Sequence, residues 1–320
     1  MPDKRILLMT QGAQVLLNWL EDVMNQGIAQ LKTTNATYWE NLASLMVDHK
    51  LGSIARRLRR FGSIIQEQEL WFDTILSEIG QLYLIAKGLS QIDRHHPIVR
   101  AEILAQAGKS MTKKEILATS PTHQPILTMG HSFGQEEQLS FRKTWYWLED
   151  DQRFAMELDF IVGRQNSFPN TLPIGLAQKA SIFDYPSTLP YRVLVQNAQR
   201  YTQKITPKML PNFSDMLQHF GIALGKNPWL VDFPCIIQSI TPILRPNNIQ
   251  LADQNGDTLE VNYHYGVANF LSLYAQKRPV HLFGAWDGRE FQPISLVLNG
   301  LVKQIRLPKP ARKQDDWGIF

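Results

Sequence analysis

The period of the hydrophobic residues changes near residue 120. In residues 16–23 apolar side chains recur every three or four positions, which is the spacing that places them on one face of a helix. In residues 154–162 they occupy every second position, which is the spacing of a strand with one buried face. We therefore predict an α+β protein, in which an N-terminal all-helical domain over residues 1–120 is followed by a mostly antiparallel β domain over residues 121–320.

Capping signals place several of the helix boundaries. Gly27 follows the first helical pattern, at a position where a helix end favours a residue that tolerates positive φ. Thr37 and Glu40 have the spacing of a capping box and predict the start of a second helix, and Thr112 and Glu115 repeat that spacing before a short helix. Residues 67–91 are predicted to form one long helix. Its apolar side contains Phe72, Ile75, Ile79, Leu82, Ala86 and Leu89.

The second part of the chain contains strand patterns joined by turns. Two alternating runs flank the polar residues 149–152, which predicts a hairpin. Asp287-Gly288 predicts another, because Asp-Gly favours tight hairpin turns. Helices are expected to interrupt the strands at roughly residues 207–224 and 266–277, and a basic tail begins at Lys303.

Composition narrows the class of protein. Apolar residues make up 44% of the chain, enough to bury a core, and the net charge of +4 is too small to indicate nucleic-acid binding by itself. Cys235 is the single cysteine, which excludes an internal disulfide and a thiolate-rich metal site within one chain. Polar residues interrupt the apolar run near the N-terminus, so we expect neither a signal peptide nor a membrane span, and a cytoplasmic location.

The segment Gly130-His131-Ser132-Phe133-Gly134 matches the Gly-x-Ser-x-Gly pattern that presents the nucleophile in α/β-hydrolases. That use of Ser132 requires a helix packed directly after the serine. Here polar residues 135–138 and then an alternating, strand-like run follow. We therefore predict that Ser132 lies in a glycine-flanked turn joining two strands and that the chain has no catalytic residue. A serine hydrolase with Ser132 as nucleophile is the less favoured alternative.

Residues that could bind a metal are poorly arranged for it. Asp253, Asn255 and Asp257 have the spacing of the first calcium ligands of an EF-hand, but His264 stands where that pattern needs a bidentate glutamate. Asn255-Gly256 favours a hairpin turn instead. The eight histidines do not form a metal-binding pattern. We expect neither a metal nor a cofactor.

Four arginines occupy one side of a predicted helix at residues 51–61. The apolar face of this helix contains Leu51, Ile54, Ala55, Leu58 and Phe61, and the opposite, exposed face contains Arg56, Arg57, Arg59 and Arg60. These four arginines are the candidate interaction surface. Such arginines either contact phosphates or pair with carboxylates of a neighbouring helix or a partner protein. Since no aromatic residues alternate with them, nucleic acid is the less favoured ligand.

Six stretches resemble the region that follows the zinc finger in bacterial SWIM zinc-finger proteins. They occur in order along nearly the whole chain: WLEDVMNQGIAQL, YWENLASLMVDHKLGSIARRLRR, SFRKTWYWLED, FDYPSTLPYRVLV, NPWLVDFP and HLFGAWDGREFQPISLVLNG. The Cys-x-Cys and Cys-x-His pairs of the finger are not found in this sequence, so no zinc ligand is carried over. The resemblance implies an interaction or regulatory module without recognised catalytic residues, and a zinc-finger protein as one candidate partner.

Together these features predict a non-enzymatic, cytoplasmic protein-interaction or regulatory module with protein partners and no membrane association. The alternative is a nucleic-acid-binding protein that uses the helix of Arg56, Arg57, Arg59 and Arg60 and the basic tail. Binding that weakens steeply with salt would identify the nucleic-acid alternative. Labelling by a serine-reactive probe would identify the hydrolase.

Overall fold

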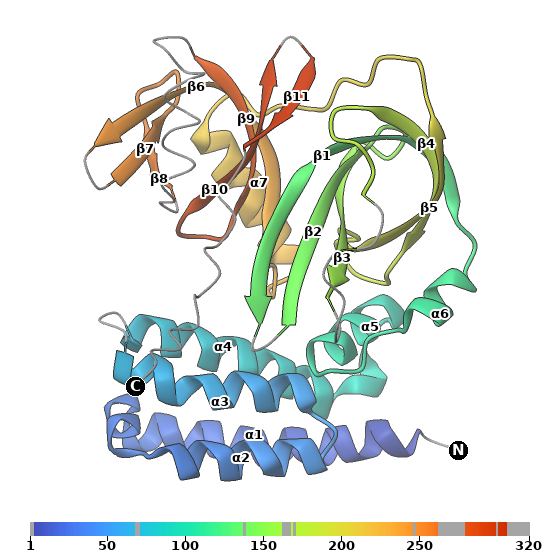
Figure 1. The fold of residues 1–320 in the computed structure, drawn as a ribbon. Helices are drawn as coiled ribbons and strands as arrows, with labels where there is room; N and C mark the ends of the chain where they lie inside the picture. Colours follow the sequence, from blue (N-terminus) through green and yellow to red (C-terminus); the bar gives the residue numbers. More distant parts are fainter. Residues whose placement is uncertain are drawn as a thin grey trace, which may run out of the picture. The chain divides into compact units, whose positions relative to one another are not determined.

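The computed structural model describes residues 3–67, 71–136, 139–161, 168, 171–245, 248–261, 279–298 and 300–305. The chain divides into two compact units (Figure 1). The first contains Met1–Ala118, Tyr185–Pro190 and Asn227–Trp229, and the second contains Thr119–Asp184, Tyr191–Lys226 and Leu230–Phe320. Two short segments that the sequence boundaries assign to the β domain therefore belong to the helical unit.

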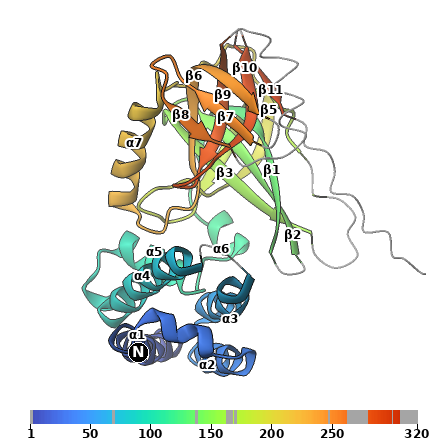
Figure 2. The ribbon, with the colours of Figure 1, turned by 90° about the vertical axis from the view of Figure 1, so that its left-hand side faces the viewer.

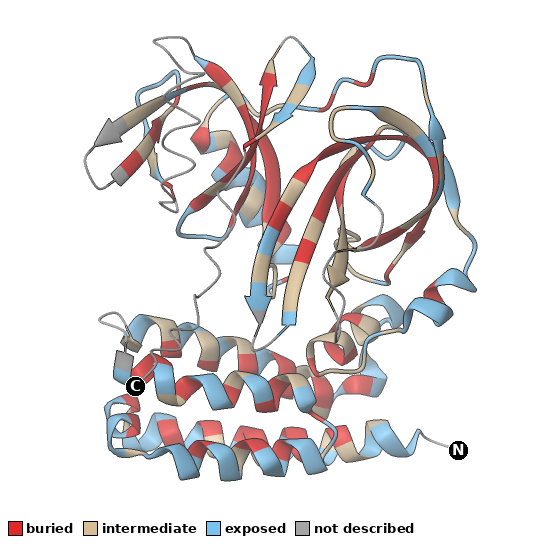
Figure 3. Cartoon of the chain, viewed as in Figure 1, coloured by how far each residue is buried: buried red, intermediate tan, exposed pale blue. Residues whose placement is uncertain are grey.

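The helical unit is built on four helices, seen end-on in Figure 2: α1 (Lys4–Gln26), α2 (Ala36–Asp48), α3 (Gly52–Glu67) and α4 (Trp71–Ser90). Shorter elements are η1 (Ile28–Thr33), η2 (Ile92–Arg94), α5 (Pro97–Gln106) and α6 (Lys113–Leu117). Each long helix buries one side, visible in Figure 3, and the buried side chains form one core that includes Leu16, Met46, Phe61 and Leu82. Burial of these apolar faces holds the bundle together.

The caps explain where the helices start and stop. Gly27 ends α1 with φ of 91°, as predicted. The predicted capping box of Thr112 and Glu115 at α6 is also confirmed. The prediction that Thr37 caps the second helix is wrong, because Asn35 performs that role and its side chain accepts a hydrogen bond from the Tyr38 backbone N–H at 2.9 Å. An asparagine oxygen satisfies a free helix N–H as well as a threonine hydroxyl does.

A tryptophan from late in the sequence belongs to the helical unit. Trp229 packs against the bundle core, and its indole N–H donates to the Gln81 carbonyl at 3.3 Å. The side chain of Asn227 accepts a hydrogen bond from the Trp229 backbone N–H at 3.0 Å. Most of the bundle core is local in sequence, but this part of it is not.

The second unit contains a five-stranded barrel. Its strands are β1 (Thr122–Glu136), β2 (Leu139–Leu148), β3 (Arg153–Phe160), β4 (Ala177–Asp184) and β5 (Val193–Arg200), in the order β3-β2-β1-β4-β5. A parallel bridge between Met156 and Arg192 brings β3 to β5, and the Met156 N–H donates to the Tyr191 carbonyl at 2.5 Å. This order, closed by a parallel contact of the third and fifth strands, is the topology of an OB-fold barrel.

The second sheet of this unit has the order β11-β10-β9-β6-β7-β8. Its strands are β6 (Phe233–Arg245), β7 (Asn248–Ala252), β8 (Thr258–Glu260), β9 (Val280–Trp286), β10 (Phe291–Leu298) and β11 (Leu301–Gln304). The predicted helix at 207–224 is present as α7 (Phe213–Lys226), which starts later than expected. The helix predicted at 266–277 and the tail beyond residue 305 lie outside the described residues. Lys303, the predicted start of the basic tail, lies in β11.

The outward face of the barrel packs against this second sheet. Trp145, Trp147 and Phe154 of the barrel share a buried cluster with Ile236 and Phe283 of the sheet. The Phe283 ring centroid lies 6.3 Å from that of Trp145 and 5.2 Å from that of Phe154. Trp145, Trp147 and Phe154 are therefore core residues. The predicted α+β fold class is confirmed.

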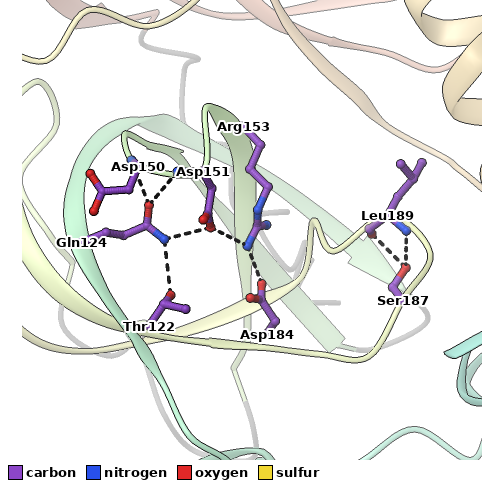
Figure 4. A network of polar contacts seen from close by, with 8 residues as sticks. All are labelled: Thr122, Gln124, Asp150, Asp151, Arg153, Asp184, Ser187 and Leu189. Carbon is purple, nitrogen blue, oxygen red and sulfur yellow. Dashed lines mark hydrogen bonds and ion pairs between the residues drawn. The ribbon is translucent and has the colours of Figure 1, made fainter. Parts of the chain in front are cut away.

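One end of the barrel is held by a polar network (Figure 4). The buried Gln124 side chain accepts hydrogen bonds from the Asp150 and Asp151 backbone N–H groups, both at 3.2 Å, and donates to the Asp151 carboxylate at 2.8 Å. Arg153 then joins Asp151, at 3.1 Å, to Asp184, at 2.7 Å. The predicted turn at residues 149–152 is therefore tied to β1 and β4 by side chains.

Candidate functional site

Ser132 lies inside a strand and not in a turn, so that prediction is wrong. It sits in β1 opposite Lys143 of β2, and it is 5% exposed. Its hydroxyl accepts a hydrogen bond from the Trp145 indole N–H at 3.3 Å. The glycine at 130 belongs to a bulge in β1, which bends the strand and does not end it. A strand follows Ser132 as the sequence indicated, and the helix that a nucleophile elbow needs is not in that place.

Charged side chains lie within the barrel at the end opposite the Gln124 network. The inward positions of β2 and β3 include Arg142 and Asp159, which form an ion pair at 2.6 Å with side chains 5% and 18% exposed. His131 lies on the same face of β1, and its Nδ1 is 3.1 Å from the Thr144 hydroxyl. Burial, followed by the positive charge of Arg142, lowers the pKa of His131 to about 4. His131 is therefore neutral at physiological pH.

A carboxylate also links β3 to β5, where the barrel closes. Glu157 of β3 accepts a hydrogen bond from the Val195 backbone N–H of β5 at 3.3 Å and another from the Tyr146 hydroxyl at 3.2 Å. Burial, followed by the charge of Glu157, raises the pKa of Tyr146 above its usual range. Each named contact of Glu157 joins two parts of the barrel wall, so this cluster acts in closing the barrel.

The four arginines of α3 differ in what they contact. Arg57 donates to Glu78 of α4 at 2.8 Å and also contacts Gln81, and it is half-buried. Arg59 forms a bidentate pair with Glu40 of α2, with both contacts at 2.8 Å. These two arginines therefore hold neighbouring helices of the bundle together, one of the two roles considered for them from the sequence.

Arg56 and Arg60, the other two members of the predicted surface, are exposed. The Arg56 guanidinium contacts the Ser53 hydroxyl at 3.4 Å. The four arginines therefore do not form one continuous basic face, because the side chains of Arg57 and Arg59 turn to opposite neighbours.

The residues with calcium-like spacing form a structural turn. The Asp253 carboxylate accepts hydrogen bonds from the backbone N–H groups of Asn255 and Asp257, at 2.8 and 3.1 Å, and from that of Phe213 at 2.9 Å. Gly256 has φ of 87°, as a tight hairpin turn requires. Asp253 thus joins the β7–β8 turn to the start of α7. Among the described residues, no group of three or more His, Cys, Asp or Glu is placed to hold a metal ion.

Cys235 lies in β6 and is 2% exposed. Burial raises the pKa of its thiol. A buried thiol that stays protonated is a packing residue, because nucleophilic chemistry requires the thiolate.

In this chain the second sheet covers the barrel face that OB-folds commonly use to bind ligands. OB-folds bind oligonucleotides or oligosaccharides on the outward face of their second and third strands. Here that face carries Trp145, Trp147 and Phe154, all buried against the second sheet. Aromatic side chains that are already packed cannot stack with bases.

An exposed apolar groove of about 490 Å³ runs between α1 and α4. It is lined by Leu20, Glu21, Met24, Asn25, Leu76, Ile79, Gly80 and Tyr83. Met24, Leu76 and Tyr83 are 54%, 43% and 44% exposed. Phe72, one turn before Leu76 on α4, is 45% exposed. Neighbouring exposed apolar side chains in a groove make it a candidate surface for contact with another molecule. We call it the α1/α4 groove.

Gly80 lines the α1/α4 groove without contributing a side chain to it. A glycine within a helix costs about 1 kcal/mol of stability relative to alanine. Packing inside this chain does not require it, because a Cβ added at Gly80 would meet nothing within 4 Å. By contrast, a Cβ at Gly88 of the same helix would lie 2.8 Å from Ile103. Close packing against Ile103 therefore explains why residue 88 is a glycine. No described atom explains why residue 80 is a glycine.

Sequence reasoning missed this groove. The pattern of residues 67–91 placed Phe72 on the buried side of its helix, and that placement is wrong. The buried side of α4 consists of Ile75, Ile79, Leu82, Ile85, Ala86 and Leu89. Phe72, Leu76 and Tyr83 form a second apolar stripe beside it. An apolar arc wider than one buried face is the signal that could have indicated the groove.

The long helices α1 to α4 with their shared core define a four-helix bundle. Residues 4–107 match the model of the SWIM-associated four-helix bundle domain. This part of the chain is therefore a SWIM-associated bundle, and the resemblance predicted from the sequence is confirmed for it. The first two of the six resembling stretches lie within the match and the other four lie beyond it. No curated protein and no solved structure matches the chain. None of the described helices has the length and apolar character needed to cross a membrane.

Proposed function

We propose that this chain is a non-enzymatic protein-interaction module that binds its partner in the α1/α4 groove. The observation that carries the proposal is the exposure of Met24, Leu76 and Tyr83 around Gly80 in one groove of the bundle. Binding would bury these apolar side chains, and their removal from water is the main source of affinity at such surfaces.

The family of the bundle suggests where the module works. A SWIM-associated domain implies the context of a zinc-finger protein, so a protein that carries such a finger is our first candidate partner. The proposed module acts in the cytoplasm and regulates its partner by occupying a helix surface. The four arginines of α3 support a nucleic-acid role less well, because Arg57 and Arg59 already pair with bundle carboxylates.

The test compares capture by the wild-type chain with capture by Leu76→Asp in extracts of the native cell. Leu76 is 43% exposed, so an aspartate there leaves the core intact and places a charge in the groove. We expect partners, identified by mass spectrometry, to bind the wild type and to be lost from the variant. The matched control is Leu84→Asp, since Leu84 is 44% exposed on α4 but does not line the groove. Equal capture by Leu76→Asp and Leu84→Asp would refute the proposal.

A further inference from the structure

We infer that the occupant of the α1/α4 groove is an amphipathic helix of a partner protein, with an apolar stripe two to three turns long and a lysine or arginine beside it. The inference rests on the proposed function, and it names the kind of partner. Its basis is the shape of the groove, the open space at Gly80 and the charge of its rim.

The shape of the groove suits a helix. Two helices form its walls, and their side chains line it at intervals of three and four residues: Leu20 and Met24 on α1, and Leu76, Gly80 and Tyr83 on α4. Ridges and grooves with this spacing accept a third helix, whose own side chains project at the same intervals. Leu76 and Tyr83 are separated by about 10 Å along α4, which matches partner side chains at positions i, i+3 or i+4, and i+7.

Gly80 provides the place for the central side chain of the partner. It lies between Leu76 and Tyr83 on the exposed side of α4, and the space in front of it is open for 4 Å. Side chains of a packed helix insert between four residues of the facing helix, and the depth of that insertion depends on the residue at the base. A glycine there lets a large apolar side chain approach the α4 backbone closely.

The charge of the rim selects a basic partner. Among the eight lining residues Glu21 carries the charge, and it is exposed on α1 beside Asn25. A lysine or arginine on the flank of the bound helix would face this carboxylate, whereas an acidic flank would be repelled. Charge complementarity therefore favours a partner helix with a basic flank over one with an acidic flank.

The experiment uses random 14-residue helical peptides displayed on phage. Peptides that bind the full wild-type chain are selected, and those that also bind the Gly80→Leu variant are removed. Since nothing lies near a Cβ at residue 80, Gly80→Leu is expected to keep the melting temperature of the wild type or raise it. We expect peptides with apolar residues at i, i+3 or i+4, and i+7, and a lysine or arginine on one flank. Their affinity should fall about tenfold with Glu21→Lys and stay unchanged with Asp22→Lys.

Asp22 is a matched control because it is the next residue of α1, is also exposed, and does not line the groove. Peptides that depend on Gly80 but are acidic or bind without forming a helix, by circular dichroism, would overturn this inference and leave the proposed function standing. The same holds for a dimer of the chain that Gly80→Leu dissociates, because the occupant would then be a second copy. If no selected peptide depends on Gly80, the inference of a helical occupant fails, whereas the proposed function fails only if Leu76→Asp and Leu84→Asp capture partners equally.

Discussion

The Arg59–Glu40 ion pair of the bundle lies at the surface between two helices, whereas the Arg142–Asp159 pair lies inside the barrel. Arg59 and Glu40 of the bundle are 38% and 55% exposed, but Arg142 and Asp159 of the barrel are 5% and 18% exposed. Exposed pairs contribute little to stability, while removal of one partner of a buried pair leaves a charge without water or counter-charge. The two parts of the chain should therefore respond very differently to the same kind of substitution.

The barrel and the bundle also differ in how far apolar side chains on their outer faces are exposed. In the barrel, Trp145, Trp147 and Phe154 are covered by the second sheet. In the bundle, Met24, Leu76 and Tyr83 remain exposed. Trp145, Trp147 and Phe154 thus belong to the core of the β unit, whereas these three side chains of the bundle remain in contact with water.

The largest effect should come from the buried pair. Arg142→Met is expected to destabilise the β unit by about 3 to 5 kcal/mol, because Asp159 would be left inside the barrel without its ion-pair partner. Arg59→Met in the bundle is expected to cost less than about 1 kcal/mol. Denaturant unfolding, monitored by tryptophan fluorescence and circular dichroism, measures both. The double variant Arg142→Met with Asp159→Leu is the control and should recover much of the loss. Similar costs for Arg142→Met and Arg59→Met would break the comparison.

The second largest effect on stability should come from Gly130, where no space is free for a side chain. Gly130 has φ of 149°, and a Cβ there would lie 2.6 Å from the Ser295 hydroxyl oxygen and 2.7 Å from Ile294. Gly130→Ala is therefore expected to cost about 3 kcal/mol through backbone strain and steric overlap. The shift in the urea midpoint of unfolding checks this. A midpoint equal to that of the wild type would mean that β1 and β10 do not approach each other as closely as described.

The third effect is a dependence of stability on pH that arises from His131 in the barrel. The pKa of His131 is lowered to about 4, so protonation favours the unfolded chain, where histidine has a pKa of about 6.5. The stability tied to neutral His131 is complete above pH 6.5 and is lost as the pH falls toward 4. Between pH 7 and pH 5 the loss should be about 1 kcal/mol after allowance for solvent screening. His131→Gln should abolish this component, and a variant with the same pH dependence as wild type would contradict the assignment.

The smallest expected effect is an increase in stability and not a loss. Gly80→Ala should stabilise the bundle by up to about 1 kcal/mol, because alanine favours a helix and nothing lies near its Cβ. The melting temperature of the bundle should rise slightly. Gly221→Ala in α7, where a Cβ also meets nothing within 4 Å, is the control and should stabilise the β unit by a similar amount. A loss of stability in Gly80→Ala would show that the groove floor is packed.

Local patterns were sufficient to predict much of the fold. The helical period of residues 51–61 identified a face on which Leu51, Ile54, Leu58 and Phe61 are all fully buried. The capping box at Thr112 and the Asp-Gly turn before β10 were also predicted correctly. These features depend on neighbours within a few residues, so the sequence contains the whole signal.

Features that depend on distant residues were not predicted. Ser132 was placed in a turn because two glycines flank it, but the bulge at Gly130 and the pairing with Lys143 keep it in a strand. The closure of the barrel depends on Met156 meeting Arg192, and no local pattern encodes that contact. The candidate site was missed for a related reason, since the exposure of Phe72 depends on which helices cover α4.

Trp229 affects the order in which the bundle can be completed during synthesis. Helices α1 to α4 leave the ribosome before the barrel strands, and domains generally fold as they emerge. The tryptophan that packs on their core and bonds to Gln81 emerges only after all five strands of the barrel. A nascent chain arrested before residue 229 therefore carries a bundle without its last core side chain. The bundle, which is made before the barrel, therefore cannot be completed until the barrel strands have been made.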